Sequence, residues 1–201
     1  MSMMSTRPAE APAGPFARLI LGLNGLLAMF PYWLIALGAR AALIRVFWWS
    51  ARTKAVDGSL IPQSLDAFKL NDTAVYLFTE EYKVHLFGAV YDLPNPPLLA
   101  TLAMIAEHTF PFLLLIGLGT RFAGLGLLGM SLFIETIYPE AYNEHLPWAV
   151  CAMVLIKWGG GFFSLDHWIA RRGFLVAVLV AALAIAAIYA SPWWLATSIR
   201  S

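Results

Sequence analysis

The sequence places three residues with proton-exchanging side chains inside long apolar stretches, and these are Glu107, His108 and Glu135. Ionisable groups at membrane depth cost several kcal/mol each and mark functional sites by default. We expect these three to take up and release protons, while Arg40 or Arg45 neutralises Glu107 and holds an anion. The alternative is a purely structural role, because a buried charge needs a partner whatever the protein does, and an Arg–Glu pair can simply hold two helices together.

Two further basic residues, Lys54 and Arg121, complete the candidates for substrate binding, and Arg121 is also expected to fix a turn. The sequence contains no metal or haem motif, since it has a single cysteine and only His108 among its histidines lies at membrane depth. A weaker alternative is a surface metal site formed by His85 and His145 with an acidic neighbour. We therefore assign no metal ligands, and expect redox electrons to come from a bound cofactor, a partner or the substrate itself.

The composition indicates a membrane protein. Hydrophobic residues make up 60% of the 201-residue chain and charged residues only 12%, whereas a soluble domain has roughly 25% charged residues. A water-soluble fold of this size could not bury so much apolar surface. The net charge of +1 provides no basic surface for nucleic acid. We expect an all-α polytopic bundle whose first partner is the lipid bilayer.

Five apolar segments are candidates for crossing that bilayer. Residues 1–15 form a disordered tail, and residues 16–201 form a single transmembrane domain. Pro31 should kink or break the first segment, which crosses once or twice. The remaining polar residues, 52–97, form a packed cap with a short amphipathic helix within residues 66–81. The predicted spans lie near residues 19–50, 98–118, 122–139, 146–158 and 173–195.

The orientation of the bundle follows from the basic residues of its connecting loops. In a five-span arrangement these residues fall on one side and the acidic cap on the other, so the positive-inside rule predicts a cytoplasmic N-terminus and an outward-facing cap. If the first segment crosses twice, only the N-terminus changes side. We expect Arg45, Glu107 and Glu135 to meet in the outer half of the bundle, beneath the cap.

Gly124, Gly126 and Gly129 match the glycine spacing of a dinucleotide-binding loop, but no strand precedes them and they lie within an apolar helix. The motif has meaning only in a strand–helix–strand unit, so we reject that function. Small residues at these positions let helices approach closely. Small residues in this span and in the last one permit a homodimer without requiring it.

Residues 107–121, with the sequence EHTFPFLLLIGLGTR, resemble the DoxX family of small membrane proteins. Those proteins carry a glutamate in the second span, followed by a leucine-rich run that ends in Gly-Leu-x-Thr-Arg. The resemblance continues at residues 138–140, 145–148 and 164–166, and residues 78–84 are similar to the cap of one subgroup. It covers roughly residues 41–167, whereas the N-terminal extension and the final span look like additions to a four-helix core.

The resemblance implies a four-helix DoxX-like bundle in a bacterial inner membrane, with an additional C-terminal helix and an outward cap. DoxX-like and DoxD-like proteins are linked to membrane oxidoreductases, including thiosulfate:quinone oxidoreductase. The leading hypothesis is therefore a membrane subunit of an oxidoreductase system, which binds a quinone or a small sulfur substrate among Glu107, Glu135 and Arg45.

Two alternatives remain open at this point. The first is a noncatalytic accessory protein of a stress-response or metal-handling system, which recruits a redox or stress-response partner through the cap, at Glu80, Glu81 and Tyr82. The second is a transporter of a small solute or a metal ion, with the buried charges as its pathway. A conservative change at Glu107 should abolish turnover or transport but spare partner binding.

Overall fold

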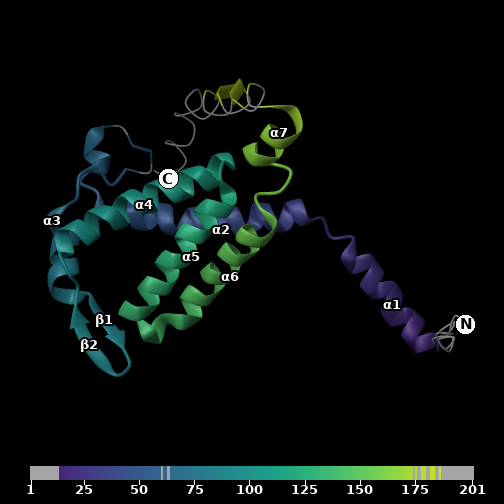
Figure 1. The fold of residues 1–201 in the computed structure, drawn as a ribbon, viewed down its shortest axis with the longest axis horizontal. Coiled ribbons are helices and arrows are strands. Elements are labelled where there is room, and N and C mark those ends of the chain that lie inside the picture. Colours follow the sequence, from purple (N-terminus) through teal and green to yellow (C-terminus); the bar gives the residue numbers. More distant parts are fainter. Residues whose placement is uncertain are drawn as a thin grey trace, which may run out of the picture. The chain divides into compact units, whose positions relative to one another are not determined.

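The computed structural model describes residues 14–59, 61–62 and 64–173, together with residues 175, 178, 179, 182, 183 and 186. The chain divides into two compact units, Met1–Tyr32 and Trp33–Ser201. The first unit contains helix α1 (Pro15–Ala28), which begins at a proline and has no buried residue. Proline suits the first turn of a helix because its missing N–H has no intrahelical acceptor there. Pro31 separates α1 from the next helix, as the sequence predicts (Figure 1).

Three helices in the described part of the chain are long and apolar enough to cross a membrane. They are α2 (Tyr32–Lys54), α4 (Pro96–Ile116) and α5 (Thr120–Ile137). The expected first span, residues 19–50, is divided near Pro31 into α1 and α2, and α2 is the part that is long and apolar enough to cross. The expected fourth span corresponds to α6 (Tyr142–Trp158), which has 17 residues. The expected final span, residues 173–195, lies largely outside the described residues.

The second unit is built around α2, α4, α5 and α6, each of which buries one face. In α2 the buried apolar residues are Ala36, Leu43, Phe47 and Ala51, at the spacing that places side chains on one side of a helix. Helices α5 and α6 run side by side (Figure 1). A Cβ atom on Gly124 would lie 3.2 Å from the backbone oxygen of Ala152, so the missing side chain allows this close packing, as the small residues predict.

One end of this bundle, which we call the turn end, contains the turns at residues 117–119 and 159–164. Arg40 holds this end together from the interior of α2. Its guanidinium donates to the carbonyl oxygens of Leu114 (Nε, 2.7 Å), Leu115 (Nη2, 2.9 Å) and Phe163 (Nη1, 2.6 Å). The first two belong to the last turn of α4, where the Leu114 carbonyl also accepts from the Gly117 N–H at 3.2 Å, and where the chain has run out of regular intrahelical donors. Arg40 therefore joins α2, the end of α4 and the turn after α6.

Asp166 accepts hydrogen bonds from backbone N–H groups at the start of α5, whereas Arg40 donates to carbonyl groups at the end of α4. Asp166 lies in the first turn of helix α7 (Leu165–Arg172). Its carboxylate accepts hydrogen bonds from the backbone N–H groups of Gly119 (2.7 Å) and Thr120 (2.8 Å), and from the Thr120 hydroxyl. Free N–H groups at a helix start favour a carboxylate in this position. The turn end is thus closed by a buried arginine and a partly buried aspartate that bond to the backbone.

The opposite end, which we call the cap end, is covered by residues 55–95. These residues form a 3-10 turn η1 (Leu65–Phe68), helix α3 (Asp72–Tyr76), a π-helical turn η2 (Leu77–Glu81) and a hairpin of strands β1 (Lys83–Leu86) and β2 (Ala89–Asp92). Phe78 and Leu93 pack with Ala100 of α4 in a buried cluster, with Tyr82 and Val84 at its edge. This cluster attaches the cap to α4.

The hairpin is the part of the fold that the all-α expectation missed. The strands are antiparallel, with Lys83 opposite Asp92, and these two side chains form an ion pair at 2.8 Å. Both turn residues have positive φ, 52° at Phe87 and 80° at Gly88, as in the type I′ turn that suits the twist of a two-stranded hairpin. The usual Asn-Gly or Asp-Gly signal is absent, and a phenylalanine at the first turn position conceals the turn from sequence analysis.

Removing the Arg40 guanidinium should destabilise the bundle strongly. In Arg40→Met the carbonyl groups of Leu115 and Phe163 lose the guanidinium donor, so we expect a loss of about 3 kcal/mol in the free energy of unfolding. The exposed Arg45 on the same helix provides the matched control, and Arg45→Met should change stability by less than about 0.5 kcal/mol. Unfolding in mixed micelles measures both variants, and equal stabilities would contradict this assignment.

Candidate cavity site

A cavity of about 860 Å³ lies between α2, α4, α5 and α6 in the half of the bundle near the cap end. Most of its wall is apolar and comes from one face of each helix, for example Leu99, Leu102 and Ala106 on α4. Phe78 and Tyr82 of the cap contribute to the wall as well. The helical spacing of these residues explains how four separate segments of sequence build one continuous surface.

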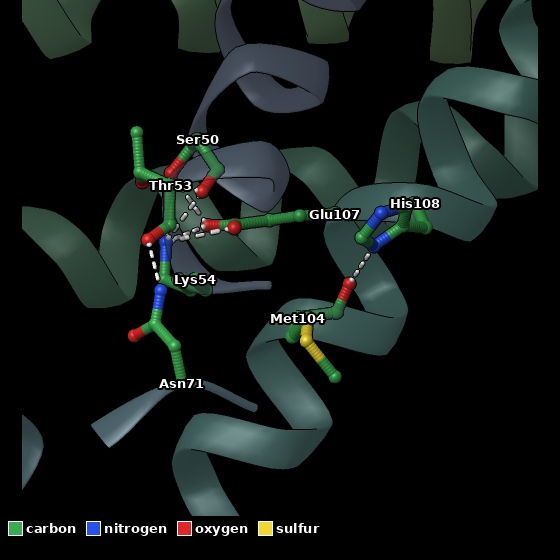
Figure 2. A network of polar contacts seen from close by, with 7 residues as sticks. All are labelled: Ser50, Thr53, Lys54, Asn71, Met104, Glu107 and His108. Carbon is green, nitrogen blue, oxygen red and sulfur yellow. Dashed lines mark hydrogen bonds and ion pairs between the residues drawn. The ribbon is translucent and has the colours of Figure 1, made fainter. Parts of the chain in front are cut away.

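The first polar group on the wall is an ion pair between α2 and α4. Lys54 Nζ lies 2.8 Å from Glu107 Oε2 and 3.0 Å from Oε1. Ser50, one turn earlier on α2, donates its hydroxyl to Glu107 Oε1 at 3.0 Å and accepts from Lys54 Nζ at 2.8 Å. Figure 2 shows the three side chains converging on one point. The Glu107 side chain is 3% exposed and that of Lys54 13%, so the charges neutralise each other where water has little access.

The second polar group comes from α5 and α6. His145 Nδ1 lies 2.8 Å from Glu135 Oε2. His145 is buried and lines the cavity, whereas Glu135 is partly exposed and holds the ring from outside the cavity wall. The imidazole also contacts the Trp148 ring, with 5.0 Å between ring centroids, and Trp148 in turn contacts Phe47 of α2 at 5.8 Å. The ring therefore has a defined place in the wall.

Two tyrosines complete the polar part of the cavity. Tyr82 of the cap and Tyr138 at the end of α5 both line it, and their rings meet edge to face with 5.6 Å between centroids. Burial raises the pKa of the Tyr82 phenol, and a hydrogen bond with Tyr138 adds to the effect. Tyr82 thus presents a neutral hydroxyl group over the ordinary pH range.

The structure changes the pairing that we expected for Glu107. Neither Arg40 nor Arg45 neutralises it, because Lys54 does. Arg45 is exposed, and Arg40 is bonded to backbone carbonyls at the turn end. The reason is helical geometry, since Arg40 and Arg45 lie 14 and 9 residues before Lys54, or about 21 and 14 Å along α2 at 1.5 Å per residue.

His108 is adjacent to Glu107 in sequence but belongs to a different cluster. Figure 2 shows the Glu107 carboxylate beside Ser50 and Lys54, and the His108 ring apart from them and bonded to the Met104 carbonyl oxygen. His108 Nε2 lies 2.8 Å from Arg52 Nη1, and Nδ1 lies 2.8 Å from the Met104 carbonyl oxygen. Arginine can only donate, so Nε2 accepts and Nδ1 carries the proton. Both ring nitrogens are thus occupied outside the cavity.

The other predicted site residues lie outside the cavity wall. Arg121 is exposed and donates to the carbonyl oxygens of Ile156 and Lys157, both at 2.9 Å, at the end of α6. It therefore ties α5 to α6 at the turn end, in accordance with its expected role in a turn. In the cap, Glu80 and Glu81 are exposed.

The contribution of His145 to this wall was not predicted from the sequence. The sequence suggested His145 only for a surface metal site, whereas the described residues contain no group of three or more His, Cys, Asp or Glu that could hold a metal ion. The available signal was an acidic residue near the end of one apolar helix and a histidine at the start of the next, on either side of a short turn. Two antiparallel helices bring such residues together.

A double-mutant cycle should show that Lys54 and Glu107 depend on each other. Lys54→Met leaves a carboxylate without its counter-charge in the wall, and we expect it to lower the free energy of unfolding by about 3 kcal/mol. Adding Glu107→Gln should restore at least half of that loss, because the uncompensated charge is then removed. Unfolding in mixed micelles provides the measurement. Strictly additive losses would show that the two residues do not interact.

The raised pKa of Tyr82 predicts how stability depends on pH in alkaline solution. Above about pH 10 an unfolded tyrosine ionises, while the buried Tyr82 stays protonated in the folded protein. The stabilisation from Tyr82 is therefore complete below pH 10 and declines as the pH rises further. The stability difference between wild type and Tyr82→Phe should shrink between pH 9 and about pH 11. Tyr76→Phe, at an exposed cap position, is the matched control, and a difference independent of pH would contradict the prediction.

Comparisons with known proteins give one positive result. The model of the DoxX family matches residues 35–138, which is just over half of the 201-residue chain. The matched region contains α2, the cap, α4 and α5, and therefore includes Lys54, Glu107 and Tyr82. No curated protein and no solved structure matches the chain. The extent of the family match, together with its membrane-crossing helices, shows that this chain is a membrane protein of the DoxX family.

Proposed function

We propose that this protein is the membrane subunit of a quinone-linked oxidoreductase system and that it binds a quinone head group in the cavity. The observation that carries the proposal is the cavity itself, about 860 Å³ of largely apolar space among membrane-crossing helices with polar groups at a few points on its wall. Its volume lies in the range of roughly 300–1,000 Å³ that is typical of small-molecule sites.

The charge of the wall favours a neutral ligand over a small sulfur anion. Lys54 is neutralised by Glu107, and the other charged residue on the wall, Glu144, is acidic. A small anion would need an unpaired cation or several converging donors to replace its hydration shell. A quinone is uncharged and requires only hydrogen bonds at its oxygens and apolar contacts elsewhere.

The sides of the cavity favour a ligand that comes from the bilayer. Trp49, Leu102 and Phe133 line the cavity and are 60%, 52% and 41% exposed. All three lie within helices that are able to cross a membrane. The space therefore extends to the apolar side of the bundle, through which a membrane-dissolved molecule could enter.

The residues on the wall have distinct tasks in this proposal. Lys54 Nζ and the Ser50 hydroxyl can donate hydrogen bonds to a ligand oxygen, and Glu107 accepts their hydrogens when no ligand is present. Trp148 and Phe47 provide aromatic surface for a planar ring. A bound quinone would supply a two-electron, two-proton couple.

A redox partner on the cap side would exchange electrons with the ligand. In this proposal the cap faces outward, because Arg121, Lys157, Arg171 and Arg172 are all at the turn end and the positive-inside rule places that end in the cytoplasm. The exposed Glu80 and Glu81 on η2 are then available to such a partner close to the cavity.

Filling the cavity should abolish quinone binding. Ala106 lines the cavity, whereas its neighbour Ile105 is exposed and does not line it. Ala106→Trp should weaken binding of a decyl-chain benzoquinone at least about tenfold, equivalent to 1.4 kcal/mol, because the indole occupies the ligand's space. Ile105→Trp should bind like the wild type. Isothermal titration of protein purified in mild detergent measures both.

The proposal fails if the wild type shows no saturable binding of the benzoquinone. A noncatalytic accessory role would then be favoured. It also fails if Ala106→Trp, shown to be folded by its elution volume and thermal unfolding, binds as tightly as Ile105→Trp.

A further inference from the structure

His145 differs from His108, the other buried histidine of the described bundle, because one of its ring nitrogens has no hydrogen-bond partner. His108 uses both ring nitrogens within the protein. In His145 only Nδ1 is bonded, at 2.8 Å to Glu135, and Nε2 has no hydrogen-bond partner in the described part of the chain. His145 lines the cavity and Glu135 does not, so the ring turns its bonded edge away from the ligand space.

We propose that His145, positioned by Glu135, distinguishes the hydroxyl form from the carbonyl form of the ligand in the cavity. This inference rests on the proposed function, and it assigns to the same site a preference for one redox form. Glu135 is a positioning residue in this arrangement, because its carboxylate accepts the Nδ1 hydrogen and so selects the tautomer. His145 is the residue that would touch the ligand.

The physical basis is the hydrogen-bonding character of Nε2 in its two protonation states. In the neutral imidazole held by Glu135, Nε2 carries a lone pair and accepts a hydrogen bond from a hydroxyl group, as in a hydroquinone. In the imidazolium Nε2 donates instead, and it then suits the carbonyl oxygen of a quinone. The neutral imidazole cannot donate to a quinone carbonyl oxygen, so this combination leaves a buried polar group unpaired and costs binding free energy, whereas a hydroxyl group can donate or accept and pairs with either form of the ring. Affinity for the hydroquinone relative to the quinone should therefore rise with pH.

Other titratable groups share the cavity and must be separated from His145 by experiment. Histidine is the side chain whose charge ordinarily changes between pH 5 and 8. Lys54 and Glu107 form an ion pair on the part of the wall between α2 and α4, and Glu144 lies one residue before His145 on α6. Glu135 of α5 bonds to His145, and the other titratable groups on the same cavity wall are Tyr138 directly after α5, Glu144 of α6, Tyr82 of the cap, Lys54 of α2 and Glu107 of α4.

The test compares two ligands over a range of pH. Dissociation constants of a decyl-chain benzoquinone and of its hydroquinone are measured anaerobically by isothermal titration between pH 5.5 and about pH 8.5, a range that brackets ordinary histidine titration. For the wild type, the ratio of the quinone constant to the hydroquinone constant should rise at least about tenfold with pH, the effect of one well-formed hydrogen bond to a charged group. In His145→Gln the ratio should change less than about twofold over the same range.

Two further variants sharpen the assignment. Glu144→Gln is the matched control, since Glu144 also lines the cavity on α6, and it should retain the wild-type rise. Glu135→Gln replaces the carboxylate that accepts the Nδ1 hydrogen, so the ring is no longer fixed in one tautomer and the rise should be smaller than in the wild type. This variant keeps His145 in place and remains informative if His145→Gln does not fold.

Several results would overturn the proposal. A wild-type ratio that is independent of pH would overturn it while the proposed quinone binding stands. A rise that persists in His145→Gln, or that is as large in Glu135→Gln as in the wild type, would assign the effect to another group. If the wild type binds neither ligand, the proposed function fails and this inference fails with it.

Discussion

The ion pair between Lys54 and Glu107 is the interaction on which the arrangement of the cap end depends. It connects the last residue of α2 to the middle of α4, and the cap begins immediately after Lys54. A carboxylate inside an apolar bundle is tolerated only when a counter-charge and further hydrogen bonds compensate for lost hydration. Ser50 supplies the additional bonds. The pair is therefore a structural necessity, and because it lies on the wall of a cavity it is also the most polar surface that a ligand would meet.

The two ends of the bundle use buried charge in different ways. At the turn end, Arg40 and Asp166 direct their charges to backbone groups at the end of α4 and the start of α5. At the cap end, charged and polar side chains bond to one another around an open space. At the turn end, Gly124 lets α5 pack closely against α6. At the cap end the helices are separated by the cavity, so the closely packed end is the base that holds the cavity residues in place.

Belonging to the DoxX family places these residues in a membrane protein without stating what they do. The chemistry must therefore be argued from the wall of the cavity, because one fold can carry many functions. A wall with balanced charge and aromatic surface suits an uncharged, planar, lipid-soluble molecule. The same wall offers hydrogen-bond donors on α2 and an acceptor on α6, which is the arrangement needed to recognise a molecule with oxygens at two positions.

The sequence by itself determined the membrane class, the helical bundle, the break at Pro31 and the family, because apolar runs, proline and a motif of contiguous residues are local properties of the chain. It also singled out Glu107, since a carboxylate in an apolar run is conspicuous without any structure. Only the tertiary structure decided that Lys54 pairs with Glu107, that Arg40 belongs to the turn end and that His108 lies outside the cavity. Those assignments depend on which face of each helix meets its neighbours and at what height, and a rotation of about 100° per residue separates Glu107 from His108. The tertiary structure likewise identified His145 as a residue of the site. His145 and Glu135 lie on different helices and form a site only because packing brings them within hydrogen-bond distance.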